Sequence, residues 1–192
     1  MRVLIFSPEK PYTGPESIVT GKLMRAMIDH GWAVEMIFHE VELLYSSDSD
    51  YLSILEFCHG IENKYLKALA KKNRRTLLSR VISHIDVLLW IVKSYSLACN
   101  IKKSCPPDLV LSRIMPSYGH IPALLFKIRY RKIPWISNWS DPLPRIKAPS
   151  PYGHGPDARA GKLNMFFLRF IIKQSDWNTF PSERLMNYYN RY

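Results

Sequence analysis

The sequence is short of cysteine, glycine and acidic residues, and the first two shortages argue against particular classes of site. Its three cysteines, Cys58, Cys99 and Cys105, are odd in number and lack metal-ligand spacing, so we expect a reducing compartment and no zinc or other metal site. Gly14 and Gly21 are too far apart for a Walker loop and form no G-x-G dinucleotide fingerprint. Neither of the two common nucleotide-binding loops is therefore present.

Acidic residues are outnumbered by basic ones, 16 to 27, which gives a formal net charge of +11. The excess is concentrated in residues 61–105, which hold ten basic side chains and two acidic ones. A local excess of this kind indicates an anionic partner, which could be a lipid surface, a phosphorylated substrate or nucleic acid.

Long uninterrupted hydrophobic runs are also lacking. Residues 77–98 come nearest to a membrane span, but charged or titratable side chains interrupt them, and a charged one costs about 2.5–3.5 kcal/mol at the bilayer centre. We expect a surface or core helix with a core-facing apolar stripe, made of Leu78, Val81, Ile82, Ile85, Leu88, Leu89, Val92 and Tyr95. The apolar run after Arg2 is too short for a signal peptide.

The first 38 residues predict a strand, a loop, a helix and a second strand. Val3–Phe6 and Val34–Phe38 are short apolar runs typical of strands buried on both faces, and the helix between them ends at Gly31. Further strands are expected at 108–111, 133–137 and 176–180, helices at 62–75, from 76 to about 105, at 121–130, 162–173 and 183–192, and loops at 41–51 and 143–161. The 192 residues therefore predict one α/β domain, a Rossmann-like open parallel sheet with helices on both faces.

Three loops should meet at one edge of this sheet. Gly14, His120 and Asp141 each follow a predicted strand, and ligands of open α/β sheets bind at the carboxyl ends of the strands. Other interpretations stay open, because Gly14 could form an ordinary turn, His120 could cap the next helix, and Asp141 could satisfy turn amides. No catalytic set follows from spacing alone.

Two basic, aromatic-rich stretches, 64–103 and 162–173, suggest contact with a large anionic partner. No nucleic-acid-binding signature accompanies them, so we favour an anionic membrane surface over nucleic acid. Trp90, Phe166 or Phe167 would then dip into the interface. A plain solvated face remains open.

Four segments, taken in order, resemble a known family. They are MRVLIFSPEKPYTGPESIVTGKLMRAMIDHGWAVEMIF, PDLVLSRIMPSYGHIPALLFKI, IPWISNWSDP and SDWNTFPSERLMNYY. Together they resemble the N-terminal, acceptor-side domain of GT-B glycosyltransferases of the family 4 type, over nearly the whole chain. The resemblance implies sugar transfer from a nucleotide-sugar donor to a polysaccharide or lipid-linked acceptor, without a metal.

The resemblance also implies site residues. His120 would lie near the transferred sugar and Asp141 would face the sugar or acceptor, as the catalytic candidates, while Gly14 would lie near the donor diphosphate. The rim formed by residues 8–16, 113–120 and 138–145 would receive the acceptor. It adds Glu16, Arg113 and Trp139 to Gly14 as substrate-binding candidates.

A complete enzyme of this type needs a second domain that binds the nucleotide sugar. That domain carries two glutamates eight positions apart, and no pair here has this spacing, so we expect the C-terminal donor domain to be absent from this chain. Separation from it should leave an apolar patch near Tyr188, Tyr189 and Tyr192. We expect a cytoplasmic protein, peripheral to the inner face of the cell membrane. The alternatives are a lone α/β binding module or an inactive fragment and, more remotely, a nucleic-acid-binding domain.

Overall fold

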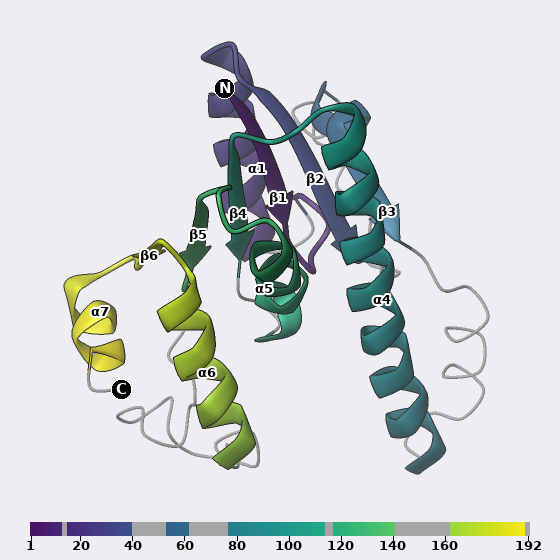
Figure 1. Ribbon diagram of the computed structural model, residues 1–192, viewed down its shortest axis with the longest axis vertical. Coiled ribbons are helices and arrows are strands. Elements are labelled where there is room, and N and C mark those ends of the chain that lie inside the picture. Colours follow the sequence, from purple (N-terminus) through teal and green to yellow (C-terminus); the bar gives the residue numbers. More distant parts are fainter. Residues whose placement is uncertain (13–14, 40–52, 62–76, 114–116, 141–161, 191–192) are drawn as a thin grey trace.

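A computed structural model describes residues 1–12, 15–39, 53–61, 77–113, 117–140 and 162–190 (Figure 1). They form one sheet in which every neighbouring pair of strands is parallel, in the order β3-β2-β1-β4-β5-β6. The strands are β1 (Arg2–Phe6), β2 (Ala33–His39), β3 (Cys58–Ile61), β4 (Leu109–Arg113), β5 (Trp135–Asn138) and β6 (Trp177–Thr179). The predicted open parallel sheet is confirmed.

Helices cover both faces of the sheet, as the sequence predicts. They are α1 (Pro15–Asp29), α4 (Leu77–Ser104), α5 (His120–Arg129), α6 (Lys162–Gln174) and α7 (Glu183–Tyr189), with single 3-10 turns η1 (Leu55–Phe57) and η2 (Ser117–Gly119). Alternate residues of β1 point to opposite faces, so Val3 and Ile5 pack with α1. Leu4 and Phe6 pack in the larger cluster with α4 and α5.

The first crossover shows how local sequence sets the geometry. Gly31 has a φ of 75°, a conformation that glycine adopts without steric cost. Its N–H donates to the Ile28 carbonyl at 2.8 Å, and the Trp32 N–H donates to the Met27 carbonyl at 3.0 Å. These bonds satisfy the last turn of α1 and return the chain into β2.

One strand was not predicted, because its sequence carries no strand signal. In β3 the residues Cys58, His59, Gly60 and Ile61 form no apolar run, and only Ile61 is buried. The strand forms by pairing with the exposed edge of β2, Met36 opposite Cys58. The helix predicted at 62–75 and the loops predicted at 41–51 and 143–161 lie outside the described residues.

Helix α4 corrects the prediction of a core-facing stripe. Of the eight stripe residues only Ile82 is buried; Leu88 and Val92 are each 61% exposed. The helix is long and apolar enough to cross a membrane by length and composition, although these two properties alone are weak evidence. Figure 1 shows its N-terminal half extending past the carboxyl ends of the strands.

The patch expected near the C-terminus is also corrected. Tyr188 and Tyr189 are buried, and Tyr189 packs on Trp139 and Phe180 with ring centroids 4.8 and 5.2 Å away. The aromatic residues of α7 therefore complete the core of this domain. Tyr192 lies outside the described residues.

Candidate functional site

The strand order places a crevice between two particular loops. The chain builds β1, β2 and β3 toward one side and then crosses to β4 on the other side of β1. At such a switch point the loops after β1 and β4 diverge, and ligands of this fold class bind between them. The described parts of these loops are residues 7–12 and 117–119.

The two segments are in direct contact. A side chain on Gly119 would collide with the Arg113 carbonyl oxygen and would lie 2.7 Å from Cδ of Pro8. The first loop is also tied to β2, since the Ser7 N–H donates to the Ile37 carbonyl at 3.1 Å and the His39 N–H donates to the Pro8 carbonyl at 3.2 Å. The described part of this rim is thus held by backbone bonds, which favours a preformed site.

The first loop also contains a strained residue. Tyr12 has a φ of 62°, which costs a residue with a side chain about 1–2 kcal/mol. Its ring is buried against Gly21 in α1, where any Cβ would overlap the ring. Gly21 therefore makes room for Tyr12, and the buried ring holds the loop in its strained conformation. Strain of this kind is concentrated at ligand sites.

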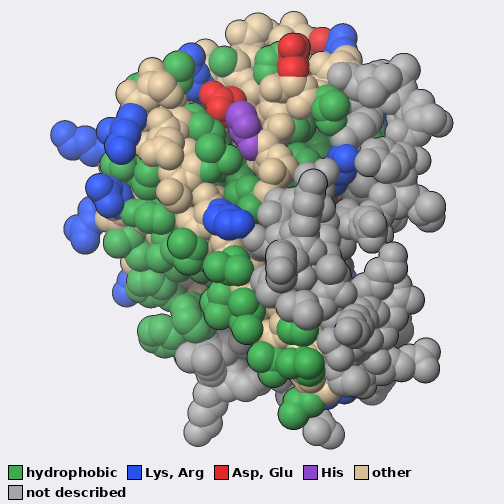
Figure 2. Space-filling model, turned by 90° about the vertical axis from the view of Figure 1, so that its right-hand side faces the viewer, with side chains coloured by type: hydrophobic (Ala, Val, Ile, Leu, Met, Phe, Trp, Pro, Cys, Tyr) green, Lys and Arg blue, Asp and Glu red, His purple; other side chains and the backbone are tan. Residues whose placement is uncertain are grey.

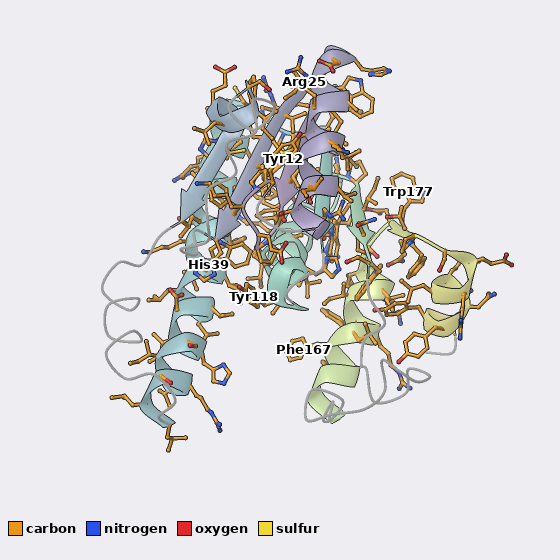
Figure 3. All side chains as sticks on the ribbon, turned by 180° about the vertical axis from the view of Figure 1, so that it is seen from behind. Tyr12, Arg25, His39, Tyr118, Phe167 and Trp177 are labelled. Carbon is orange, nitrogen blue, oxygen red and sulfur yellow. The ribbon has the colours of Figure 1, made fainter. Side chains whose placement is uncertain are left out.

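A polar cluster that sequence reasoning missed lies at the same edge. Nε2 of His39, at the end of β2, lies 3.0 Å from a carboxylate oxygen of Asp86 in α4, and Nδ1 lies 3.2 Å from the hydroxyl of Tyr118 in η2. His39 is buried and stacks on Trp90 with ring centroids 5.8 Å apart. Figure 3 shows His39 and Tyr118 side by side below the ends of the strands.

The electrostatics of this cluster fix the state of the phenol. Burial, with contributions from the carboxylates of Asp86 and Glu9, raises the pKa of Tyr118 to about 12. Tyr118 is therefore a neutral hydroxyl at physiological pH, able to donate one hydrogen bond. The nearby Asp86 carboxylate, 3.0 Å from Nε2, favours the tautomer with its proton on Nε2, and in that tautomer Nδ1 of His39 is the acceptor for the Tyr118 hydroxyl. The position of His39 at a strand end is the sequence signal that could have found this cluster.

His120, the predicted catalytic histidine, lies in the core. It is 0% exposed, Nδ1 lies 2.6 Å from the Ser112 hydroxyl, and the ring centroid is 4.4 Å from that of Trp139. Burial lowers its pKa to about 3, so the ring is neutral at physiological pH. Its side chain does not cap α5, whose N-cap is Gly119 with no side-chain bond.

The other predicted site residues divide into three groups. Arg113 ends β4 and is buried, and Trp139 is buried with its indole N–H donating to Ser137 at 2.8 Å and Asn178 at 3.0 Å. Glu16 lies in the first turn of α1, and its side chain is not described. Gly14 and Asp141 lie outside the described residues, so their assignment stays a prediction.

A separate cavity of about 410 Å³ lies at the opposite edge of the sheet, lined by Lys127, Ile128, Arg131, Gln174 and Asp176. Nζ of Lys127 donates to the carbonyls of Arg131 and Ile133 and to Asp176, at 2.9, 3.0 and 2.6 Å. Partial burial opposes ionisation of Asp176, but hydrogen bonds from Lys127 and the Trp135 amide outweigh it and lower the pKa. These bonds join α5, β5 and β6, so we assign them a structural role.

The described residues hold no group of three or more His, Cys, Asp or Glu side chains that could bind a metal ion. The sequence matches no protein-family model and no curated protein. Its fold, however, matches solved structures. The UDP-GlcNAc 2-epimerase from Neisseria meningitidis bound to UDP-GlcNAc superposes with a TM-score of 0.53 at 19% identity, over 100% of this chain and 43% of that one.

Two further solved structures superpose on this chain in the same way. A putative UDP-N-acetylglucosamine 2-epimerase from Listeria monocytogenes gives a TM-score of 0.52 at 11% identity, covering 99% of this chain and 41% of that one. S. aureus MnaA in complex with UDP gives 0.50 at 14% identity, covering 99% and 40%. The chain has a GT-B-like α/β fold. It spans less than half the length of these structures, and identities this low establish the fold alone.

Proposed function

We propose that this chain is the acceptor-binding half of a glycosyltransferase of the family 4 type. The complete enzyme would transfer a sugar from a nucleotide sugar, held by a C-terminal donor domain, to a polysaccharide or lipid-linked acceptor at the inner face of the cell membrane. The observation that carries the proposal is the rim at the switch point, where the β1 and β4 segments interlock at Gly119 and Pro8 beside the His39 cluster. The proposal is also supported by the fold, which matches less than half the length of larger enzymes named for a nucleotide sugar.

Within this proposal the rim residues take separate tasks. Tyr118 stays a neutral phenol: its O–H donates to Nδ1 of His39, which positions the phenol, and its oxygen accepts a hydrogen bond from a hydroxyl of the acceptor. Gly14 and Asp141 keep the roles implied by the family resemblance. His120 is 0% exposed, so we assign it as a positioning residue behind Trp139. No step requires a metal.

A second candidate is half of a sugar-nucleotide epimerase, favoured by the names of the solved structures with this fold. Both candidates use a nucleotide sugar, but their products differ. A transferase moves the sugar onto an acceptor, whereas a 2-epimerase returns a nucleotide sugar inverted at C2.

The test uses the complete product of the native gene, incubated with radiolabelled UDP-sugars and vesicles made from the lipids of the same cells. Label in the lipid or polymer fraction supports the transferase. A C2 epimer that remains nucleotide-linked supports the epimerase. Unchanged nucleotide sugar with every donor tested would overturn both and leave a non-catalytic α/β module.

The rim assignment has its own test in the same assay. Tyr118→Phe removes only the hydroxyl and should lower kcat/KM for the acceptor about 2- to 12-fold, the size of one neutral hydrogen bond worth about 0.5–1.5 kcal/mol. Tyr95→Phe, a phenol on α4 that hydrogen-bonds Arg129 at 3.4 Å, is the matched control. Equal activity of the two variants would remove Tyr118 from the site.

A further inference from the structure

A regular apolar stripe of α4 faces away from the protein. Seven large apolar side chains of α4 are exposed, and they recur at helical spacing along the helix: Leu77, Leu78, Val81, Ile85, Leu88, Leu89 and Val92. At about 100° per residue they fall within one sector about 120° wide. The sector is continuous over the first 16 residues of α4, about 24 Å at the helical rise.

The opposite side of α4 is fixed to the domain. Its buried side chains are Ile82, Trp90, Ile91, Ser94, Ala98 and Ile101. Asp86 lies on this inner side and pairs with His39 at 3.0 Å. Rotating the stripe into the core would break this pair and expose Trp90, which is 0% exposed. The outward direction of the stripe is therefore set by the fold.

The charges on α4 are almost all positive. Arg80 lies on one flank of the stripe and Lys93 on the other, and Lys102 and Lys103 follow in the last turn. Asp86, the one carboxylate among residues 77–104, is directed inward to His39. Hydrophobic side chains gather on the side of the molecule that carries α4, with lysines and arginines beside them (Figure 2).

Helix α6 repeats the arrangement at smaller scale. Phe166 and Phe167 are 61% and 42% exposed, and the cations Arg169 and Lys173 follow on the same helix. Figure 1 shows α4 and α6 extending in the same direction past the carboxyl ends of the strands, on either side of α5. Phe167 is seen on α6 in Figure 3.

We propose that the outward stripe of α4, with Phe166 and Phe167 of α6, inserts into the interface of an anionic membrane. Apolar side chains enter the boundary between headgroups and acyl chains, and the flanking cations lie on anionic headgroups. A second copy of this chain fits less well, because the flanks would bring cation against cation. The sequence analysis expected Trp90 to insert into the interface, but Trp90 is 0% exposed. In this proposal the exposed aliphatic residues of the stripe insert instead.

This inference rests on the membrane part of the proposed function and on none of its chemistry. Vesicle binding needs neither donor nor acceptor. Failure to bind would therefore leave sugar transfer untouched, and failure to transfer sugar would leave vesicle binding untouched.

The experiment is flotation of the full 192-residue chain with vesicles of phosphatidylcholine alone or with 30% phosphatidylglycerol, at about 150 and 500 mM NaCl. The first variant is Leu88→Gln/Val92→Gln, two exposed stripe residues one turn apart. The matched control is Ile18→Gln/Val19→Gln, two exposed apolar residues of α1 on the other face of the sheet. Circular dichroism confirms that each variant is folded.

We expect the chain to float with anionic vesicles and to bind less at high salt. The stripe variant should lose at least about tenfold in partitioning, because each residue withdraws apolar area from the interface, and the control should bind like the wild type. Arg80→Gln/Lys93→Gln should lose about fivefold per charge. Absence of flotation, equal binding to neutral vesicles, or equal losses in stripe variant and control would each overturn the proposal. So would self-association that the stripe variant abolishes while vesicle binding is unchanged.

Discussion

Two regions of this molecule each contain a buried histidine next to a tryptophan, and their partners differ. In the core region His120 packs 4.4 Å from Trp139, and Nδ1 lies 2.6 Å from the Ser112 hydroxyl. In the rim region His39 stacks on Trp90 and lies between a carboxylate of α4 and a phenol of η2. One histidine fills space between strands and a helix, while the other joins three elements at the edge of the sheet.

The comparison shows that position after a strand does not by itself make a histidine part of a site. His120 was selected from the sequence because it follows a strand, yet it begins α5 and its side chain points into the core. His39 ends a strand, and its carboxylate partner lies 47 positions away in sequence, on a different element. Partners of this kind are set by the fold.

The largest loss of stability should come from shortening a side chain in the core region. Trp135 is fully buried, and its indole N–H donates to Ser112 at 2.8 Å, so Trp135→Ala should cost about 3–5 kcal/mol of the free energy of unfolding. Trp177→Ala, at a 57% exposed position on edge strand β6, should cost less than about 1 kcal/mol. Urea unfolding followed by circular dichroism measures both. Equal costs would mean that the core region is not packed as described.

The next prediction concerns pH. The folded pKa of His120 is about 3 and the unfolded value is about 6.5, so between these pH values the unfolded chain binds a proton that the folded chain does not. Stability is therefore lost as pH falls through this window, by up to about 1.4 kcal/mol per pH unit. In His120→Gln the free energy of unfolding should change less steeply with pH, because about one proton fewer is taken up on unfolding. Identical slopes in the two proteins would show that His120 titrates normally in the folded state.

The junction between the regions should be sensitive to a single methyl group. Gly119→Ala places Cβ against the Arg113 carbonyl oxygen and Pro8, and a backbone atom cannot move aside as a flexible side chain can. We expect a loss of about 1–3 kcal/mol. Gly31→Ala is an informative control, because nothing lies within 4 Å of its Cβ and only the positive φ opposes the change. If Gly119→Ala is neutral, the two rim segments are not interlocked.

The smallest effect should come from the rim pair. Asp86→Asn keeps the shape but removes the charge that faces His39, and we expect a loss of about 1 kcal/mol. The pKa of Tyr118 should fall below about 12, because Asp86 contributes to raising it after burial. Carbon NMR of the tyrosine ring, assigned with Tyr118→Phe, follows this titration.

The exposed ion pair of Arg25 with Asp29 provides the control for that variant, at 2.9 Å on the surface of α1. Asp29→Asn should cost no more than about 0.5 kcal/mol and leave the titration of Tyr118 unchanged. If the pKa of Tyr118 is the same in the wild type and in Asp86→Asn, the Asp86 carboxylate does not act on Tyr118.

The fold could be predicted because its signals are local. Strands β1, β2, β4 and β5 are short apolar runs, and their observed bounds lie within two residues of the predicted ones. Gly31 marked the end of α1 correctly. Strand β3 could not be predicted, since His59 and Gly60 carry no strand preference and the strand exists by pairing with β2.

The side-chain arrangement could be predicted less well, because periodicity identifies an apolar face without saying what covers it. The stripe of α4 has the spacing of a core face, but the core selects the other side of the helix, through Trp90, Ser94 and Ala98. The sequence also placed Trp139 on the rim, where β5 ends, but its ring turns into the core toward His120 and Tyr189.

The most direct test of the central claim asks which edge of the sheet meets the ligand. Amide NMR spectra of the labelled chain would be recorded during titration with short saccharide acceptors prepared from the polysaccharide and lipid-linked sugars of the same cells. If the switch-point rim is the working edge, shift changes should centre on residues 7–12, His39 and Tyr118. Changes confined to the opposite cavity, at Lys127, Arg131 and Gln174, would contradict the account, as would unchanged spectra at millimolar ligand.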